Sequence, residues 1–158
     1  MSRGSGLDLS ETSSLWYGFS IVEANSSPDV TREGQMLWHR ADQSPIQSAI
    51  KGGCQNDDGT WNYFFLPTDW SKKADGTASN RDGSDGQVMN YWPDFYFKVE
   101  MNNPSAGIHL FKFSPYPISG FTKVNSHSLS AYQAALDRTN LKLSSVVNST
   151  AQYRGGNN

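Results

Sequence analysis

The segment 91–101 alternates apolar and polar side chains, and this alternation restricts the fold more than any other feature of the chain. Because successive side chains of a β-strand point to opposite faces, the alternation predicts one long strand with an inward and an outward face. The turn-forming sequence Asn102-Asn103-Pro104 follows, and residues 108–113 are expected to return as an antiparallel partner strand. The inward face would carry Tyr91, Pro93, Phe95, Phe97, Val99 and Met101, and the outward face Trp92, Asp94, Tyr96, Lys98 and Glu100.

Other short segments predict further strands and turns. Residues 16–22 and 61–66 are rich in aromatic and β-branched side chains, which favour strands, and another short strand is expected at 35–39. The sequence Asn56-Asp57-Asp58-Gly59 predicts a hairpin turn. Residues 72–86 are polar and rich in glycine, so they are expected to form an exposed loop.

Two segments predict short helices. The stretch 44–51 begins with a serine suited to the N-cap and a proline, and two glycines follow its last residue. It is therefore expected to form a capped helix with Ile46 and Ile50 buried. Residues 129–141 are ambiguous, but their alanines favour a helix from about Ala134. The expected fold class is α+β, rich in antiparallel strands and with one or two short helices.

Length and composition favour one folded domain. Residues 1–14 are rich in serine and glycine and are predicted to form a flexible arm, whereas 15–158 are predicted to form a single β-rich domain. Aromatic residues make up 13% of the chain and include five tryptophans, which argues against disorder.

The charge balance argues against nucleic acid as a partner. The chain has 13 basic and 15 acidic side chains and a net charge of -2, so it lacks the excess of cations that phosphate binding requires. No apolar run approaches the ~18 residues that span a bilayer, and residues 1–10 lack the apolar stretch of a signal peptide. We expect neither nucleic-acid binding nor membrane insertion.

No segment carries a catalytic or cofactor-binding motif. Cys54 is the only cysteine and is expected to be a small buried residue. The histidines at 39, 109 and 127 lack the close spacing typical of zinc sites. The stretch 75–85 has the carboxylates and glycines of a calcium loop, but Met89 stands where an EF-hand requires a glutamate. We expect solvated turns there and no cofactor; a calcium ion and a partner-contact loop remain the alternatives.

The aromatic residues carry the remaining functional signal. Tryptophan and tyrosine can stack on sugar rings or anchor protein interfaces. Two aromatic residues on the polar face of the 91–101 strand indicate that something covers that face. The candidate contact residues for a partner or a glycan are Trp38, His39, Arg40, Trp70, Trp92 and Tyr96.

A set of segments, taken in order, carries a family resemblance. The set comprises Trp16-Tyr17-Gly18-Phe19, His39-Arg40, Ser44-Pro45-Ile46-Gln47-Ser48, Gly53-Cys54, Asp57-Asp58-Gly59, residues 80–89, Ser130-Ala131-Tyr132-Gln133-Ala134, and the stretches 142–146 and 153–158. Together these segments resemble tail-fibre and receptor-binding proteins of phages and prophages of gut Bacteroidetes, over about residues 15–158. That family is distantly similar to the C-type-lectin-like fold of the formylglycine-generating-enzyme group. The resemblance therefore implies a partial fold of this kind.

The resemblance also implies a role in a virion appendage. In such scaffolds the ligand surface follows the stretch matching Arg154-Gly155-Gly156, and this sequence stops at Asn158. The expectation is a chain that lacks the C-terminal ligand-binding half. The resemblance further implies that 128–133 form a strand leading into a helix. The expected function is that of a non-enzymatic structural component of a phage tail fibre or receptor-binding assembly, contributing to assembly and host attachment.

The expected function implies particular partners, and two alternative functions remain open. The partners would be other virion proteins, further copies of the chain, with a trimer favoured, and a host surface glycan or protein. The chain would be made in the host cytoplasm and located in the virion. One rival function is a monomeric carbohydrate-binding or adhesin module that uses the exposed aromatics, and a more distant one is a hydrolase with a spatially assembled site. The mass of the particle in solution distinguishes the virion component, which should self-associate, from the monomeric binding module.

Overall fold

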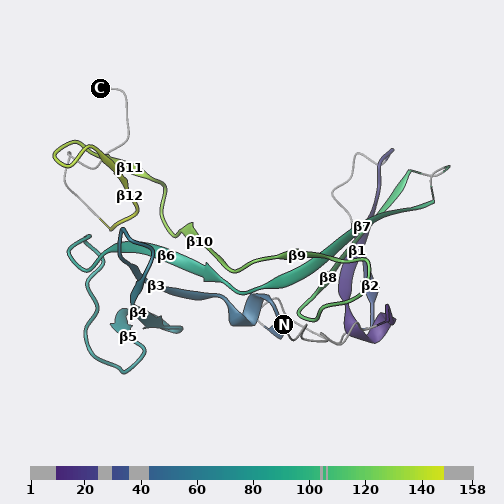
Figure 1. Ribbon diagram of the computed structural model, residues 1–158, viewed down its shortest axis with the longest axis horizontal. Coiled ribbons are helices and arrows are strands. Elements are labelled where there is room, and N and C mark those ends of the chain that lie inside the picture. Colours follow the sequence, from purple (N-terminus) through teal and green to yellow (C-terminus); the bar gives the residue numbers. More distant parts are fainter. Residues whose placement is uncertain (1–9, 25–29, 36–42, 104, 106, 148–158) are drawn as a thin grey trace, which may run out of the picture. The chain divides into compact units, whose positions relative to one another are not determined.

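The computed structural model describes residues 10–24, 30–35, 43–103, 105 and 107–147, which fold as antiparallel β-sheets with short 3-10 turns (Figure 1). The chain divides into two compact units. The first unit comprises Met1–Ala49 and Pro93–Ser126, and the second comprises Ile50–Trp92 and His127–Asn158. Each unit contains one five-stranded sheet. The expectation of one domain from residue 15 onward stays a prediction.

The first unit is built on a sheet of order β2-β1-β8-β7-β9, in which every neighbouring pair is antiparallel. The strands expected at 16–22 and 108–113 are confirmed within one residue, and they pair with each other as well as with their other neighbours. The elements of this unit are η1 (Ser13–Leu15), β1 (Tyr17–Val22), β2 (Thr31–Gly34), η3 (Gln47–Ala49), β7 (Phe95–Asn103), β8 (Ile108–Ser114) and β9 (Thr122–Val124).

The second unit is built on a sheet of order β10-β6-β3-β4-β5, together with the small pair β11 and β12. The strand expected at 61–66 and the hairpin turn before it are both confirmed, because β3 and β4 are joined at Gly59, which has a φ of 88°. The strands are β3 (Lys51–Gln55), β4 (Trp61–Leu66), β5 (Asp69–Lys73), β6 (Gln87–Trp92), β10 (His127–Ser130), β11 (Ala135–Asp137) and β12 (Lys142–Ser144).

Each unit has its own small core on one side of its sheet. In the first unit Trp16, Leu110 and Ile118 are buried together. In the second unit Cys54 and Val88 are fully buried beside Phe65, which confirms the expectation for the cysteine. Partly buried neighbours complete the two clusters: Leu15 and Phe121 in the first, and Tyr63, Trp70, Ala131 and Tyr132 in the second.

The single long strand expected at 91–101 is wrong. Strand β6 ends at Trp92 and β7 begins at Phe95, and the two strands belong to different sheets. Pro93 has no N–H with which to continue a ladder. The next residue, Asp94, accepts a hydrogen bond from the Ser126 backbone N–H at 2.6 Å instead of pairing in a strand.

The expected faces of this region are also reversed in β7. Val99 and Met101, which were expected to point inward, are 49% and 53% exposed. Lys98 and Glu100 instead point to the covered side, where both form ion pairs with described charged residues. The alternation therefore predicted a strand correctly. Its polar side chains lie on the covered side because the buried Lys112 requires carboxylate partners there.

Both expected helices are wrong. Within 44–51 the structure has only the 3-10 turn η3 before β3 begins at Lys51. Ile46 is buried at 3% exposure as expected, whereas Ile50 is only half-buried. The segment 129–141 contains β10 and β11 instead of a helix, so only the strand part of the 128–133 expectation is confirmed. Within 129–141, pairing of β10 with β6 and of β11 with β12 provides backbone hydrogen bonds that outweigh weak helix propensity.

Two other expectations concern the segments 35–39 and 72–86. The strand expected at 35–39 stays a prediction, because residues 36–39 lie outside the described residues; the structure has the strand β2 just before it, at Thr31–Gly34. The polar stretch 72–86 is mostly loop, although β5 includes its first two residues. In the ranges that the structure describes, no helix is long and apolar enough to cross a membrane.

Candidate interaction sites

Strands β1, β8 and β7 place a group of aromatic and aliphatic side chains on the side of the first sheet opposite its core. The register aligns Tyr17 with Phe113 and Phe97, and it aligns Phe19 with Phe111 and Val99. Paired residues point to the same side of a sheet. We call this group the aromatic face; its members are Tyr17, Phe19, Phe97, Val99, Met101, Phe111 and Phe113.

The rings of the aromatic face contact one another, but most of them are incompletely covered. Phe19 stacks on Phe111 with ring centroids 5.0 Å apart, and its centroid lies 6.2 Å from that of Phe113. Tyr17 is buried, the four phenylalanines are half-buried, and the two aliphatic members are about half exposed. The aromatic face is therefore a packed apolar surface that still faces solvent in the single chain.

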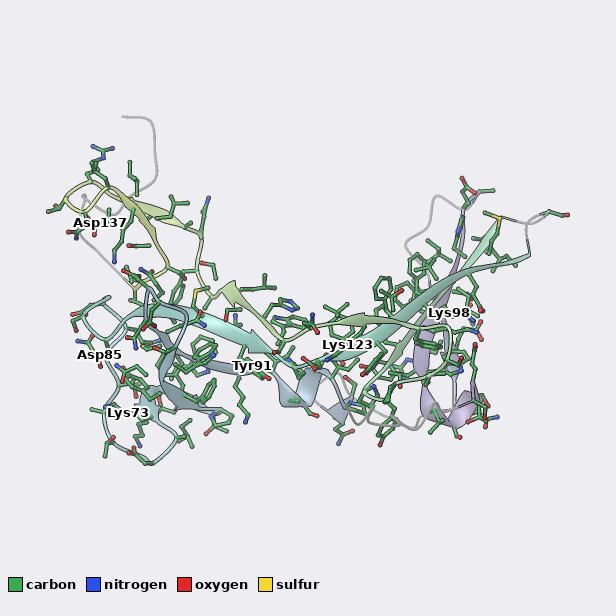
Figure 2. The ribbon with its side chains drawn as sticks, in the orientation of Figure 1. Lys73, Asp85, Tyr91, Lys98, Lys123 and Asp137 are labelled. Atoms are coloured by element: carbon green, nitrogen blue, oxygen red, sulfur yellow. The ribbon has the colours of Figure 1, made fainter. Side chains whose placement is uncertain are left out.

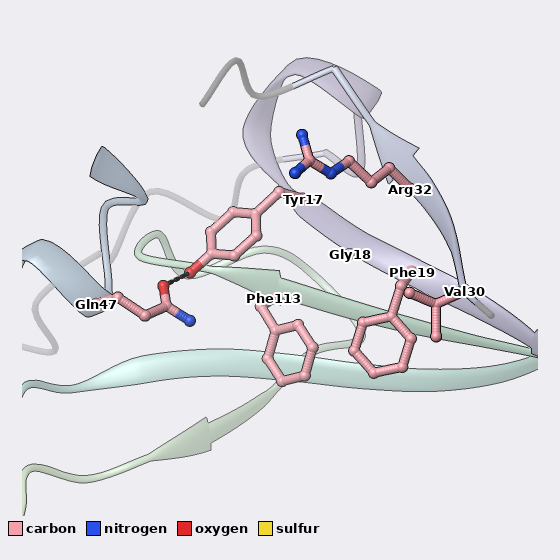
Figure 3. A pocket seen from close by; sticks show the side chains of 7 residues that line it. All are labelled: Tyr17, Gly18, Phe19, Val30, Arg32, Gln47 and Phe113. Atoms are coloured by element: carbon pink, nitrogen blue, oxygen red, sulfur yellow. Dashed lines mark hydrogen bonds between the residues drawn. The ribbon is translucent and has the colours of Figure 1, made fainter. Parts of the chain in front are cut away.

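A groove of about 310 Å³ opens on the β1 side of the aromatic face (Figure 3). The Tyr17 hydroxyl donates a hydrogen bond to Gln47 Oε1 at 2.8 Å. Burial raises the pKa of Tyr17, so its phenol keeps its proton and remains a donor. The groove is lined by Tyr17, Gly18, Phe19, Val30, Arg32, Gln47 and Phe113.

The core side of the first sheet carries a cluster of four charges. Lys112, only 6% exposed, forms ion pairs with Glu11 and with Glu100 at 2.6 Å, and its Nζ lies 4.8 Å from the Trp16 ring centroid. Lys98 pairs with the same two carboxylates at 2.8 Å and 2.5 Å; Figure 2 shows this lysine on β7. Through Glu11, the cluster holds the segment before η1 against the first sheet, so the cluster has a structural role.

The electrostatic effect of this cluster is clearest at its carboxyl groups. For Glu11, burial would raise the pKa, but hydrogen bonds and charge from Lys112 and Lys98 outweigh burial, so the pKa is lowered. For Glu100, hydrogen bonds from the same two lysines lower the pKa. Both carboxyl groups therefore stay ionised at neutral pH.

The second sheet has a pocket of about 150 Å³ at the edge of its core. Trp70 on β5 stacks on Phe65 with centroids 5.2 Å apart, and its indole lies directly over Gly52 on β3. Asn90 on β6 pairs with Gly52 in the sheet, so its side chain is on the same side. The pocket is lined by Ile50, Lys51, Gly52, Phe65, Pro67, Trp70 and Asn90.

The same side of the second sheet continues along β6 to Trp92. Residues 90 and 92 share a side because side chains alternate along a strand. Trp92 pairs with His127 on β10, and its indole stacks on the imidazole at a centroid distance of 6.1 Å and an angle of 9°. The structure therefore brings two candidate contact residues, Trp70 and Trp92, onto one side of one sheet.

The opposite side of the second sheet carries another aromatic cluster. Trp61 and Phe64 stack at 4.6 Å, and Tyr91 meets both rings edge to face at 6.1 Å. The backbone of Gly53 lies beneath this cluster, because a Cβ there would come within about 3 Å of both the Trp61 and Phe64 rings. All three side chains are half-buried, and their rings pack against one another.

The remaining candidate residues are distributed differently from the expectation. Trp38, His39 and Arg40 lie outside the described residues. Tyr96 is half-buried on β7 in the first unit, so it does not share a strand with Trp92. Their proposed contact roles stay predictions, but the expectation that Trp92 and Tyr96 lie on one strand is wrong.

The carboxylates of the candidate calcium loop accept hydrogen bonds from groups of the chain itself. Asp75 accepts hydrogen bonds from the Thr77 N–H at 2.9 Å and from its hydroxyl at 2.6 Å, and Asp82 accepts one from the Ser84 N–H at 2.9 Å. Asp85, labelled in Figure 2, accepts a 2.7 Å hydrogen bond from the Tyr63 hydroxyl. Across the described ranges, no group of three histidine, cysteine, aspartate or glutamate side chains forms a metal-binding cluster.

These turns belong to a pattern that the sequence analysis missed. An aspartate followed two residues later by serine or threonine occurs repeatedly, and five such aspartates in the described ranges accept a hydrogen bond from the backbone N–H of that second residue. The Asp-x-Ser/Thr spacing itself is the signal that could have revealed them. The five turns begin at Asp58, Asp69, Asp75, Asp82 and Asp137.

The two residues with the strongest resemblance to catalytic groups have structural roles. The Tyr63 hydroxyl donates a hydrogen bond to Asp85 Oδ2 at 2.7 Å and accepts one from the Asn80 backbone N–H at 3.0 Å, and burial is the largest of the effects that raise its pKa. Burial likewise raises the pKa of the Cys54 thiol, whose sulfur contacts the Asn80 carbonyl at 3.3 Å. Both groups keep their protons at neutral pH and connect β3 and β4 to the loop between β5 and β6.

The two histidines in the described ranges lie in different units. His109 is 3.4 Å from Glu23 in the first unit, and His127 stacks on Trp92 in the second.

The chain was also compared with known proteins. No protein-family model, no curated protein and no solved structure matches this sequence.

Proposed function

We propose that this chain is a non-enzymatic structural component of a phage virion appendage, a tail fibre or receptor-binding assembly, that contributes to assembly and host attachment. Its partners are other copies of itself and other virion proteins, and its location is the virion. The assignment to phages, and a partial C-type-lectin-like fold, rest on the sequence resemblance. The observation that carries the assembly role is the aromatic face of the first sheet.

The aromatic face supports association because it is apolar, packed and exposed at once. Single exposed apolar residues are normal on soluble proteins, whereas a contiguous group across three strands typically marks an interaction surface. Phe111 and Phe113 of the central strand β8 lie between Phe19 on β1 and Phe97 on β7. Interfaces between identical subunits are enriched in such side chains.

The closed symmetry of the assembly is part of the proposal. A trimer is proposed only because the sequence resembles phage fibre proteins, whose subunits commonly associate in threes. The aromatic face supports association of any closed symmetry.

Light scattering on the purified chain tests the assembly role. A trimer would have three times the 17.5 kDa mass of the chain. The double variant Val99→Lys and Met101→Lys places two charges on the aromatic face at positions that are already about half exposed, so the chain should fold but lose mass per particle. The matched control is Leu143→Lys on β12, which is 70% exposed and should leave the mass unchanged.

A wild-type chain that remains monomeric at high concentration would contradict the assembly role. Detection of the chain by mass spectrometry in purified phage particles tests the virion assignment separately. Its absence from particles that carry the other tail proteins would contradict that assignment.

The second candidate function is a carbohydrate-binding module. One observation favours it: Trp70 and Asn90 line the same pocket of the second unit. Because this pocket is in the other unit from the aromatic face, both functions can belong to one chain.

A further inference from the structure

We propose that the pocket between Trp70 and Asn90 binds one pyranose ring of a neutral glycan, with the adjoining sugar directed towards Trp92. This inference names the ligand class for host attachment and rests on the attachment role proposed above.

The size of the pocket suits a single sugar ring. Its volume of about 150 Å³ equals that of about five water molecules. Such a space accommodates one six-membered ring but no long segment of chain. The pocket walls are largely apolar, with Ile50 and Pro67 beside the indole of Trp70.

The indole of Trp70 is held in place without a ligand. It stacks on Phe65 at an interplanar angle of 29°, and atom Cζ2 would lie 2.4 Å from a Cβ at position 52. Only glycine there allows the ring to lie against the β3 backbone. The Trp70 carbonyl also accepts a hydrogen bond from the Ser79 hydroxyl at 2.6 Å. A side chain that is already ordered loses little entropy when a ligand binds.

Asn90 supplies the polar group that a sugar requires. A side-chain amide offers one acceptor oxygen and two N–H donors, which match neighbouring hydroxyl groups on a pyranose. Within the part of the chain that the structure describes, the Asn90 amide makes no hydrogen bond to protein. The amide is therefore available to a ligand in the pocket.

The chemistry of the pocket favours a neutral sugar. A pyranose has an apolar C–H face that suits an indole and a hydroxyl edge that suits an amide. Lys51 is the one charged residue among the described lining residues, but it alternates with Gly52 along β3, so its side chain lies on the opposite side of the sheet, where its Nζ is 5.5 Å from the centroid of the Phe64 ring. The described lining residues include no carboxylate or guanidinium group, so a charged sugar would gain no ion pair inside the pocket.

Trp92 extends the surface in one direction. It follows Asn90 by two residues on β6 and presents an indole stacked on His127. A second sugar attached to the first would lie along β6 over this pair. The proposal therefore predicts tighter binding of a disaccharide than of a monosaccharide.

Saturation-transfer NMR on the full chain tests the proposal, with glucose, galactose, mannose and N-acetylglucosamine and their disaccharides as probes. We expect transfer to the ring protons of at least one neutral sugar. Asn90→Ala should weaken that binding about tenfold, because it removes the amide hydrogen bonds. Asn90→Leu, which has a similar size but removes both the donors and the acceptor, should also weaken it and serves where the alanine variant folds poorly.

Two further variants separate the parts of the site. Asn62→Ala is the matched control, because Asn62 is an exposed amide on β4 that donates to the Asp85 carbonyl at 3.2 Å, and binding should be unchanged. Trp92→Ala should weaken disaccharide binding and leave monosaccharide binding as it was. Near-ultraviolet circular dichroism establishes that each variant is folded.

The outcomes distinguish this inference from the assembly role. No transfer to any neutral sugar, transfer only to acidic sugars, or equal binding by the wild type and the folded Asn90 variants would overturn the inference. Light scattering on the same samples reports association independently. A monomer that binds sugar supports the inference while contradicting the assembly role, and an oligomer that binds no sugar does the reverse.

Discussion

At the scale of single residues, Gly52 controls the position of Trp70 in the second unit. A Cβ at this position would lie 2.4 Å, 2.7 Å and 2.8 Å from three atoms of the Trp70 indole, which is closer than van der Waals contact permits. Gly52→Ala is therefore expected to displace the indole and lower the free energy of unfolding by about 1–3 kcal/mol, the usual cost of overpacking. Urea denaturation followed by circular dichroism measures this cost.

A double-mutant cycle provides the control for this prediction. When Trp70→Ala removes the indole, adding Gly52→Ala should cost nothing and should even stabilise the strand slightly, because alanine is a better strand residue than glycine. An equal cost of Gly52→Ala with and without Trp70 would mean that the indole is not what requires the glycine.

The loop carboxylates lead to a second prediction at the residue scale. Asp75, Asp82 and Asp85 already accept hydrogen bonds from Thr77, Ser84 and Tyr63 respectively. Extensive dialysis against a chelator should therefore leave the melting temperature of the chain unchanged. A fall of several degrees that added calcium reverses would instead indicate an ion bound to the native loop.

At the scale of elements, the charge cluster couples the segment before η1 to strands β7 and β8. Glu11 and Glu100 both have a pKa below the ordinary value of 4.5, as described above. A carboxyl group whose pKa is lower in the folded state stabilises the protein above its unfolded pKa and loses this contribution as the pH falls through the folded pKa. The stability of the first unit should therefore decline as the pH falls below 4.5.

Denaturation midpoints measured from about pH 6 to about pH 3 test this prediction. The double variant Glu11→Gln and Glu100→Gln should show a weaker dependence on pH over that range. Glu33→Gln on β2 is the control, because Glu33 accepts a hydrogen bond from the Ser20 hydroxyl, and it should retain the wild-type dependence. An unchanged pH dependence in the double variant would contradict a stabilising role for the cluster.

Sequence patterns predicted strands better than they predicted faces or helices. The strands at 16–22, 61–66 and 108–113 were predictable because their aromatic and β-branched residues leave few alternatives. The covered face of β7 was not predictable, since the carboxylate of Glu100 points inward to a lysine on another strand. A helix was predicted within 129–141 because local propensity contains no information about the pairing of β10 with β6 or of β11 with β12.

The candidate sites were only partly predictable for a similar reason. The sequence identified Trp70 and Trp92 as contact candidates by residue type. It could not show that they share one side of a sheet, since β5 and β6 are separated by β4 and β3 in the sheet order. Asn90 carried no sequence signal, because asparagine is common in this chain and its significance comes from its position opposite Gly52.

At the scale of the whole molecule, the chain passes three times between its two compact units. The passages follow Ala49, Trp92 and Ser126, so each unit is assembled from two separate stretches of sequence. Length suggested one domain and could not indicate this division, because no linker of distinct composition marks the passages. Each unit nevertheless has its own buried cluster, and the aromatic face belongs wholly to the first.

If the aromatic face joins copies of the chain, the thermal stability of the protein must depend on its concentration. Association that requires the native state stabilises that state by mass action, by up to about 1.4 kcal/mol for each tenfold rise in partner concentration. For a chain of this size such a change should raise the melting temperature by about 3 °C. Differential scanning fluorimetry over two decades of concentration measures it. The Val99→Lys, Met101→Lys variant should melt at one temperature throughout, whereas Leu143→Lys should retain the wild-type dependence. A wild-type melting temperature that is independent of concentration would mean that the aromatic face does not join copies of this chain.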